Sequence, residues 1–354
     1  MDVLNVKTNT NEYSVCIAQG LSQNLPKSLN ELYPGSRFAI ISDTNVLRIY
    51  GENIKQGFDS AGLHYGVVSI KPGEKSKSIR VFSDIVSRLA QDHYNRADVI
   101  VALGGGIVGD LAGFVAATYL RGIRYVQVPT TLLAQIDSSV GGKTAVNLHE
   151  GKNLVGAFYQ PSAVFIDTDF LKTLKDKDFA DGMAEMIKYA MIKDKEMLNV
   201  LENSSINAHS NKLKDLIIRC LKIKRDIVSA DEKDMGERML LNFGHTIGHG
   251  IERVSATQGI PISHGHAVAC GMAAITAGSE RAGQTKPGTA KRIADLLKKA
   301  NLPFSIDGFD KNQILKGILV DKKNVADKLN IILLKEPGCA FIYSIQKKDM
   351  DIYI

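Results

Sequence analysis

Cysteine is scarce in this sequence. Only Cys16, Cys220, Cys270 and Cys339 occur among 354 residues, and no two of them form a Cys-x-x-Cys pair. This spacing excludes a zinc ribbon and a dithiol redox motif. All four cysteines lie in apolar segments, so we expect buried, reduced thiols, which favour a reducing compartment such as the cytoplasm.

Long apolar runs and concentrated charge are also missing. No apolar stretch reaches the roughly 18 residues that a membrane span needs, and residues 1–7 lack the basic and apolar segments of a secretory signal. The 44 Lys and Arg exceed the 38 Asp and Glu by six, but they are spread along the chain. A nucleic-acid binder usually gathers this charge in one stripe. We therefore expect a cytoplasmic protein without nucleic-acid or membrane partners, whose mild positive charge suits small anions.

The segment pattern predicts two domains, since 354 residues exceed one ordinary core. Short apolar runs predict strands at 37–43, 65–70, 98–103 and 125–129. A helical pattern with one apolar face covers 78–91. Such alternation favours a parallel sheet with helices on both faces. We predict an α/β, Rossmann-like NAD-binding domain at 1–168.

Helical patterns dominate from about residue 170. The predicted helices are 178–202, 211–230, 240–254, 264–282 and 287–300. Near the end, two apolar runs flank Pro337-Gly338 and predict a hairpin. We therefore expect a mainly α-helical domain at 169–354, which binds metal and substrate.

A glycine-rich turn joins the predicted strand at 98–103 to a predicted helix at 111–120. Gly104, Gly106 and Gly109 fit the G-x-G-x-x-G pattern, in which bare backbone approaches a pyrophosphate at a helix N-terminus. The acidic residue that usually follows about 20 positions later is absent, so this is no ordinary Rossmann fingerprint. A structural glycine turn remains the alternative.

Other polar residues follow neighbouring predicted strands. Asp43, the segment 72–77 and Thr130-Thr131 each come directly after an apolar run. Because parallel strands end at one edge of a sheet, we expect these residues to share that edge. Carboxylates such as Asp43 or Glu74 would suit ribose hydroxyls there, although each residue alone is typical of a turn.

Histidines are concentrated in the predicted helical domain. Four of the eight lie between His245 and His266. His245 and His249 are one helical turn apart, a spacing compatible with a shared metal, and His264 and His266 open the next predicted helix. Earlier in the chain, Glu185 lies on a mostly apolar helix. One carboxylate and two imidazoles are suitable ligands for Zn²⁺ and leave a position open for substrate.

Each of these features also has an ordinary structural interpretation. A histidine at a helix start is usually a cap or a solvated group, and Lys188 would ordinarily pair with Glu185. Lys143 would ordinarily be a surface lysine, although the glycine pair Gly141-Gly142 before it could wrap an anion.

Taken together, eight segments closely resemble the 3-dehydroquinate synthase family. They follow the family's order at 72–77, 102–122, 128–147, 151–161, 184–190, 231–252, 263–268 and 321–324. The resemblance implies conversion of 3-deoxy-D-arabino-heptulosonate 7-phosphate into 3-dehydroquinate and phosphate, with NAD and one Zn²⁺ or Co²⁺, in aromatic amino acid biosynthesis. The implied steps are oxidation at C5, β-elimination of phosphate, reduction of the ketone, and ring opening followed by an intramolecular aldol reaction.

The resemblance also implies roles for individual residues. Glu185, His245 and His264 would hold the metal. The residues that match those working on the substrate are Asp137, Lys143, Asn153, Lys188, Lys224, Arg238, Asn242, His249, Lys322 and Arg121. The residues that match the cofactor contacts are Asp43, Glu74, Lys77, Gly105, Gly106, Ile107, Val108, Gly109, Asp110, Thr130, Thr131, Lys143, Lys152, Phe170 and Thr173.

Some of these roles are more specific. Asp137 and Lys188 would relay a proton at the substrate hydroxyls, and His249 would work near the phosphate. Arg121 would reach the pocket of a neighbouring subunit, which implies a homodimer. Two positions depart from the family, since His266 and Asp234 each replace a usual glutamate. The imidazole of His266 would compete with His264 for metal or add positive charge beside the phosphate.

Three other functions remain compatible with parts of this pattern. A cyclase for another sugar phosphate would share the platform but would lack the residues that grip a carboxylate. A metal-dependent polyol or glycerol dehydrogenase would release NADH and would not need the loops around Lys143 and Asn153. A nucleotide-binding sensor would not need the metal set.

Overall fold

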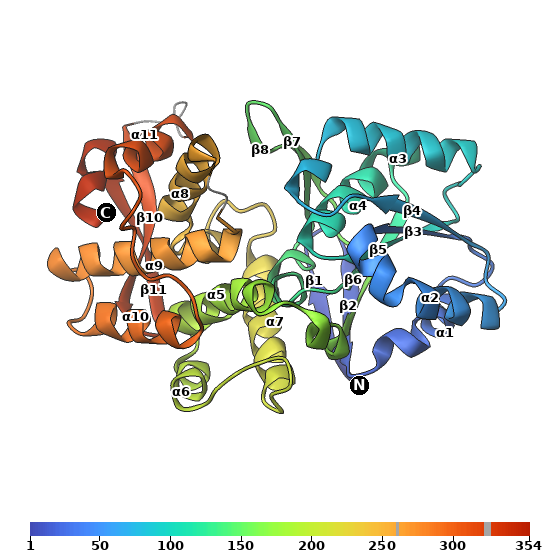
Figure 1. The fold of residues 1–354 in the computed structure, drawn as a ribbon, viewed down its shortest axis with the longest axis horizontal. Helices are drawn as coiled ribbons and strands as arrows, with labels where there is room; N and C mark the ends of the chain where they lie inside the picture. Colours follow the sequence, from blue (N-terminus) through green and yellow to red (C-terminus); the bar gives the residue numbers. More distant parts are fainter. Residues whose placement is uncertain (260–261, 322–326) are drawn as a thin grey trace. The chain divides into compact units, whose positions relative to one another are not determined.

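The computed structural model describes residues 1–259, 262–321 and 327–354 (Figure 1). Within these residues the chain forms two compact units. Unit 1 comprises Met1–Leu174 with Lys224–Glu232, and unit 2 comprises Lys175–Ile223 with Lys233–Ile354.

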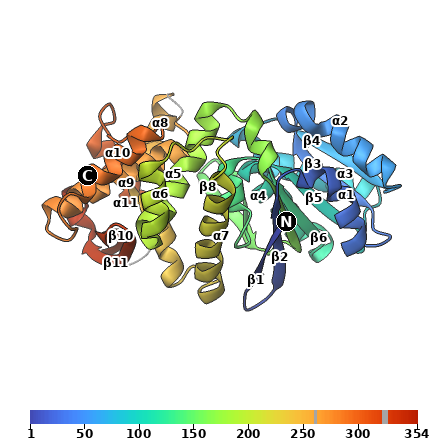
Figure 2. The same cartoon turned by 90° about the horizontal axis from the view of Figure 1, so that it is seen from below.

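Unit 1 is built on a seven-stranded sheet with the order β1-β2-β9-β6-β5-β3-β4. The strands are β1 (Asp2–Lys7), β2 (Glu12–Ala18), β3 (Phe38–Asp43), β4 (Tyr65–Ile70), β5 (Val99–Gly104), β6 (Arg124–Pro129) and β9 (Ala163–Asp167). Strands β1 and β2, dark blue in Figure 2, pair antiparallel at one edge. The strands from β2 to β4 in this order pair parallel.

Helices and a separate hairpin complete unit 1. The helices are α1 (Leu21–Leu32), α2 (Thr44–Ser60), α3 (Ile79–Gln91) and α4 (Gly106–Thr118), and the hairpin joins β7 (Lys143–Leu148) to β8 (Gly151–Phe158). The expected strands and the expected helix at 78–91 are confirmed. Strands β1, β2, β7, β8 and β9 were not predicted.

Both faces of the sheet are buried, as the continuous apolar strands predict. Alternate residues of one strand point to opposite faces. On β3, Ile41 belongs to a core cluster with Leu111 of α4, while Phe38 belongs to a second cluster with Leu25 of α1 and Phe58 of α2. The prediction of a parallel sheet covered on both faces is therefore confirmed.

Unit 2 is mainly helical, as expected. Its helices are α5 (Asp176–Lys193), α6 (Lys195–Asn203), α7 (Leu213–Ala230, with its last turns in unit 1), α8 (His245–Gln258), α9 (His264–Arg281), α10 (Thr289–Lys299) and α11 (Lys311–Asp321). The predicted hairpin is β10 (Lys328–Glu336) with β11 (Cys339–Gln346). Among the described helices, none is long and apolar enough to cross a membrane.

Two predicted helices are interrupted, and one begins earlier than expected. The predicted helix at 178–202 breaks at Asp194, whose carboxylate accepts from Met197 N at 2.9 Å and so starts α6. The predicted helix at 240–254 breaks at Gly244, which has φ 79° between a 3₁₀ segment and α8. A left-handed residue cannot continue an α-helix. The helix expected from residue 111 begins at Gly106.

The cysteine prediction was right in part. None of the four cysteines forms a disulfide, and Cys220 and Cys270 are buried. Cys16 is half-buried, whereas Cys339 is exposed on β11, which contradicts the expectation of burial.

Candidate active site

The glycine turn lies where β5 meets α4. Helix α4 begins directly at Gly106, behind Gly105 as its N-cap residue. A Cβ atom added to Gly105 would lie 3.1 Å from Thr131 Cγ2, and one added to Gly106 would lie 3.0 Å from Ser138 Oγ. The first amides of any helix have no partner within it. The turn therefore offers bare backbone and a helix N-terminus, which together suit an anion such as a pyrophosphate.

The sheet edge carries the other polar residues that were expected there. Because β3, β4, β5 and β6 are parallel, Asp43, Gly104 and Thr130 lie at their carboxyl ends along one edge. Asp43 Oδ1 caps α2, accepting from Asn45 N at 2.8 Å and Val46 N at 3.1 Å. The buried Thr130 donates its N–H to Gly104 O at 2.9 Å. The expectation of a shared polar edge is confirmed.

Lys77 connects two of the predicted groups of residues. Its side chain is 6% exposed, forms an ion pair with Asp110 of α4, and donates to Asn153 Oδ1 of β8. Asn153 has φ 57°, and its N–H donates to Asn147 Oδ1 at 2.9 Å. Asn147 Nδ2 in turn donates to Glu74 at 2.6 Å. These contacts fix the β7–β8 hairpin beside the first turn of α4.

Three of the remaining predicted residues of unit 1 are exposed, on the β7–β8 hairpin and after α4. Lys143 and Lys152 are exposed on the β7–β8 hairpin, and Gly141 and Gly142, with φ of 104° and 68°, form the expected tight turn before Lys143. The left-handed Arg121, with φ 64°, is exposed after α4.

Two further contacts within unit 1 involve predicted residues. Asp137, in a π-helical turn, forms an ion pair with Lys224, and their side chains are 17% and 9% exposed. The buried Phe170 packs its ring 4.7 Å from that of Tyr50, whose hydroxyl hydrogen-bonds with Thr173.

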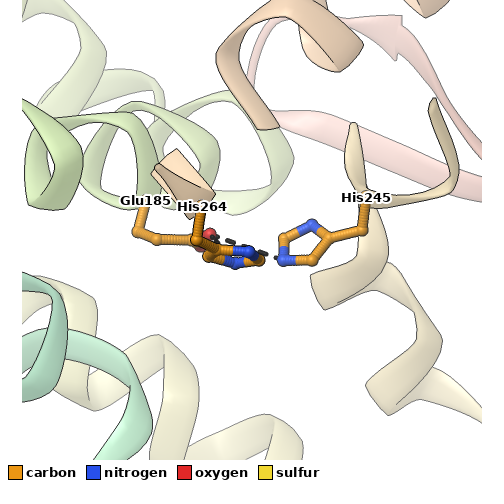
Figure 3. A group of neighbouring side chains, drawn as sticks. All are labelled: Glu185, His245 and His264. Atoms are coloured by element: carbon orange, nitrogen blue, oxygen red, sulfur yellow. Dashed lines mark ion pairs between the residues drawn. The ribbon is translucent and has the colours of Figure 1, made fainter. Parts of the chain in front are cut away.

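The strongest constellation in unit 2 is Glu185 of α5, His245 of α8 and His264 of α9 (Figure 3). Glu185 Oε1 lies 3.4 Å from His245 Nε2 and 3.6 Å from His264 Nε2. Zinc bonds of about 2.0–2.1 Å in tetrahedral geometry separate neighbouring ligand atoms by about 3.3–3.4 Å. The donor atoms thus already stand at the spacing of a shared divalent ion.

The surroundings orient His245 as a neutral ligand and hold a proton on His264, which a bound metal ion must displace. His245 Nδ1 lies 3.1 Å from the Phe243 carbonyl oxygen, which orients the ring with Nε2 toward Glu185. Burial lowers the pKa of His245 to about 3, so this imidazole is neutral. Burial also opposes the charged form of His264, but Glu185 and Glu252 outweigh it and raise its pKa to about 10.

Glu185 is paired with Lys188 in the same helix. The two side chains are 0% and 1% exposed and form an ion pair. Burial of a charge is tolerated only with such compensation. Lys188 therefore pairs with Glu185, as its ordinary structural interpretation expects, while Glu185 also belongs to the group of possible metal ligands.

Other predicted residues lie near this cluster or outside the described residues. The exposed His249 has its ring centroid 5.6 Å from that of His245 and 6.1 Å from that of His264. Arg238, 2% exposed, and Asn242 lie in the 3₁₀ segment Glu237–Asn242 before α8. Lys322 lies outside the described residues.

Comparisons with known proteins identify the family of this chain. The family model described as the 3-dehydroquinate synthase N-terminal domain matches residues 67–181, and that of the C-terminal domain matches residues 182–324. The 3-dehydroquinate synthase of Clostridium acetobutylicum is 46% identical over 100% of this chain and 99% of its own. That of Clostridium kluyveri is 44% identical over 99% and 97%.

The chain belongs to the 3-dehydroquinate synthase family. The resemblance read from the sequence, and with it the prediction of an enzyme of this family, is confirmed.

Two solved structures of other synthases share the fold. A 2-deoxy-scyllo-inosose synthase in complex with carbaglucose-6-phosphate, NAD⁺ and Co²⁺ has a TM-score of 0.88 and 26% identity, with 99% of both chains covered. A 2-epi-5-epi-valiolone synthase from Streptomyces hygroscopicus with NAD⁺ and Zn²⁺ has a TM-score of 0.88 and 23% identity, over 99% of this chain and 97% of its own. The α/β plus helical fold class predicted for this chain is therefore confirmed.

A glycerol dehydrogenase from Sinorhizobium meliloti is more distant. Its TM-score is 0.63 at 15% identity, over 86% of this chain and 88% of its own, so the likeness concerns the fold alone.

The structure shows two neighbours of the candidate metal site that the sequence did not indicate. Glu252 lies 3.7 Å from His264 Nδ1, and its only sequence signal is the spacing of three residues from His249 on α8. The other neighbour is Asp181, whose carboxylate contacts His266 and is not one of the grouped donors Glu185, His245 and His264. Its only signal is the spacing of four residues before Glu185 on α5.

Proposed function

We propose that this chain converts 3-deoxy-D-arabino-heptulosonate 7-phosphate into 3-dehydroquinate and phosphate, using NAD and one divalent metal ion. The observation that most supports this proposal is the cluster of Glu185, His245 and His264 in a chain that matches both domains of the 3-dehydroquinate synthase family. The related cyclase solved with NAD⁺, Co²⁺ and a sugar phosphate analogue supports this cofactor pair.

Unit 1 is assigned to NAD. The glycine turn at Gly105 and Gly106 supplies the bare backbone that a pyrophosphate needs. Asp43 uses Oδ1 to cap α2, and the proposal assigns its Oδ2 to a ribose hydroxyl. Lys77 holds Asp110 in place beside the same turn. When bound, NAD supplies a reversible oxidation of one substrate hydroxyl. The remaining proposed contacts are Glu74, Ile107, Val108, Gly109, Thr130, Thr131, Lys143, Lys152, Phe170 and Thr173.

Unit 2 is assigned to the metal. Glu185, His245 and His264 are its proposed ligands, because their donor atoms all lie within 4.8 Å of one another. When bound, the ion polarises the hydroxyl oxygens of the substrate and lowers the pKa of the one that is oxidised. Lys188 forms an ion pair with Glu185 and is proposed to hold a proton at the same hydroxyls. Asp137 is proposed to share this proton with the substrate.

The substrate's two anionic groups require cationic and polar partners. The proposed set is Lys143, Asn153, Lys224, Arg238, Asn242 and Lys322, with His249 near the phosphate. Burial of Arg238 at 2% exposure supports this, since buried guanidinium groups bind carboxylate and phosphate with paired hydrogen bonds. These residues favour a sugar phosphate that carries a carboxylate over sugar phosphates that lack one.

The oligomeric state, the domain boundaries and the cellular compartment are part of the proposed function. The exposed, left-handed Arg121 is assigned to the pocket of a neighbouring subunit, so the active form would be a homodimer. The NAD-binding domain is assigned to residues 1–168 and the metal- and substrate-binding domain to residues 169–354. The enzyme is assigned to the cytoplasm.

Phosphate release and NADH formation distinguish the proposal from its alternatives. With metal, NAD and 3-deoxy-D-arabino-heptulosonate 7-phosphate, the purified protein should release phosphate without accumulating NADH. Release only from another sugar phosphate would identify a different cyclase. Steady NADH formation on glycerol or another polyol would identify a dehydrogenase.

A further inference from the structure

The first turn of α9 is attached to α5 through His266 and Asp181. The backbone N–H of His266 donates to Asp181 Oδ1 at 3.1 Å, and His266 Nδ1 lies 3.2 Å from the same oxygen. The two side chains are 17% and 18% exposed. Because an ionised carboxylate only accepts hydrogen bonds, His266 Nδ1 is the donor to Asp181. Nδ1 also lies 2.8 Å from Ser263 Oγ.

Asp181 takes the place of an N-cap for α9. Ser263 is the N-cap residue, but it makes no side-chain cap bond, and its hydroxyl contacts His266 instead. The amide of His266, the third residue of the helix, would otherwise lack an intrahelical partner. The carboxylate of Asp181 satisfies this amide from another helix and places negative charge at the helix N-terminus, where it is favourable.

The backbones of the two helices also approach closely here. A Cβ atom added to Gly265 would lie 2.1 Å from the carbonyl oxygen of Asp181. Gly265 stands between His264 and His266, and Asp181 precedes Glu185 by one helical turn on the same face of α5. The Asp181–His266 contact therefore lies one turn of α5 away from Glu185, within the same contact between α5 and α9.

We propose that Asp181 and His266 are positioning residues for the metal site. Together they hold α5 against the first turn of α9, so that Glu185 Oε1 and His264 Nε2 stay 3.6 Å apart. This inference rests on the proposed metal site. It also assigns a role to the imidazole of His266, since a glutamate there would place a second carboxylate beside Asp181.

Zinc affinity measured by competition with a chromogenic chelator tests this on the full chain. Asp181→Ala and His266→Glu should each weaken Zn²⁺ binding by about tenfold, the lower end of the effect of losing a side chain that is hydrogen-bonded to a ligand, because these two residues act through the helix contact. The double variant Asp181→Asn with His266→Glu should bind zinc within about threefold of the wild type, because an amide can donate to the new carboxylate.

Asp194→Ala is the matched control. Asp194 also accepts the amide of the third residue of a helix, from Met197 at 2.9 Å, and it also pairs with a side chain, that of Arg219. Its removal should lower the melting temperature as Asp181→Ala does, with zinc affinity unchanged.

The possible results distinguish the positioning role of Asp181 and His266 from the metal site itself. If the wild type binds one zinc ion and Asp181→Ala binds it equally well, the positioning role is wrong and the metal site stands. Equal weakening by Asp194→Ala would also overturn the positioning role, because general instability would then explain both. Loss of one histidine nitrogen from the zinc coordination shell of His266→Ala, counted by X-ray absorption, would make His266 a ligand and overturn the inference. A wild type that binds no divalent metal would refute the proposed metal site itself.

Discussion

Glu185→Gln is the substitution that tests the metal site most severely. It keeps the volume of the side chain but removes the charge that faces His245 and His264 and pairs with Lys188. Glu185 and Lys188 are 0% and 1% exposed, so losing one partner should cost about 3–5 kcal/mol in the metal-free protein. Free Zn²⁺ at about a hundredfold above its dissociation constant should stabilise the wild type by a further 2.7 kcal/mol or so and the variant not at all.

Thermal unfolding with and without Zn²⁺, together with zinc content by mass spectrometry, measures both effects. His245→Asn provides a second ligand variant that leaves the Glu185–Lys188 ion pair in place, in case the first variant does not fold. Glu202→Gln is the control, because it removes charge from the pair with Arg292, whose side chain is 38% exposed, and should keep its zinc. Wild-type zinc content in Glu185→Gln would refute the ligand assignment.

Three other perturbations test separate parts of the account. Arg238→Ala should weaken substrate binding by about 2–5 kcal/mol in calorimetry, since it truncates a buried charge partner; an unchanged affinity would place Arg238 outside the pocket. Gly106→Ala should weaken NAD binding by at least about tenfold, or 1.4 kcal/mol, because its Cβ would enter the turn 3.0 Å from Ser138 Oγ, and equal NAD affinity would contradict the assigned site. Burial opposes ionisation of Asp98, but hydrogen bonds from Arg37 outweigh it and hold the pKa of Asp98 below the usual 3.8. The ionised carboxylate therefore stabilises the fold fully above about pH 4, and this stabilisation is lost as the pH falls through the lowered pKa. Asp98→Asn should therefore reduce the free energy of unfolding at pH 7 by about 1–3 kcal/mol and weaken the acid dependence; an identical pH profile would contradict this.

The sequence predicts the parts of the fold that follow from local pattern. Strands β3, β5 and β6 were predicted as apolar runs, as burial on both faces requires, and the glycine turn follows directly from β5. Strand β9 was missed, although all five of its residues are buried. Strand β8 was missed because most of Gly151–Phe158 is exposed or half-buried, so it carries no apolar alternation. Strands β1 and β2 lie at the sheet edge, where β2 alternates buried and half-buried residues over only seven positions.

The two interrupted helices show where local pattern is insufficient. Helical periodicity continues through both residues. At Asp194 an extended backbone (φ −136°) ends α5 and the side chain caps α6, whereas at Gly244 a left-handed backbone precedes α8. This matters for function at Gly244, because the left-handed turn fixes where α8 begins and therefore where His245 points.

The candidate metal site shows a similar division. The density of histidines indicates a metal, but spacing along the chain favours His245 with His249, whereas the structure groups His245 with Glu185 and His264 from two other helices. Such a set depends on helix packing, which one sequence does not encode locally. The contact of His266 with Asp181 depends on the same packing.

Phosphate release from 3-deoxy-D-arabino-heptulosonate 7-phosphate tests the central claim most directly. The assay contains purified protein, NAD and Zn²⁺, and it follows inorganic phosphate and the absorbance of NADH together. The account predicts stoichiometric release of phosphate that requires both cofactors, with no net NADH. Absence of release from a protein that has bound zinc and NAD would contradict it.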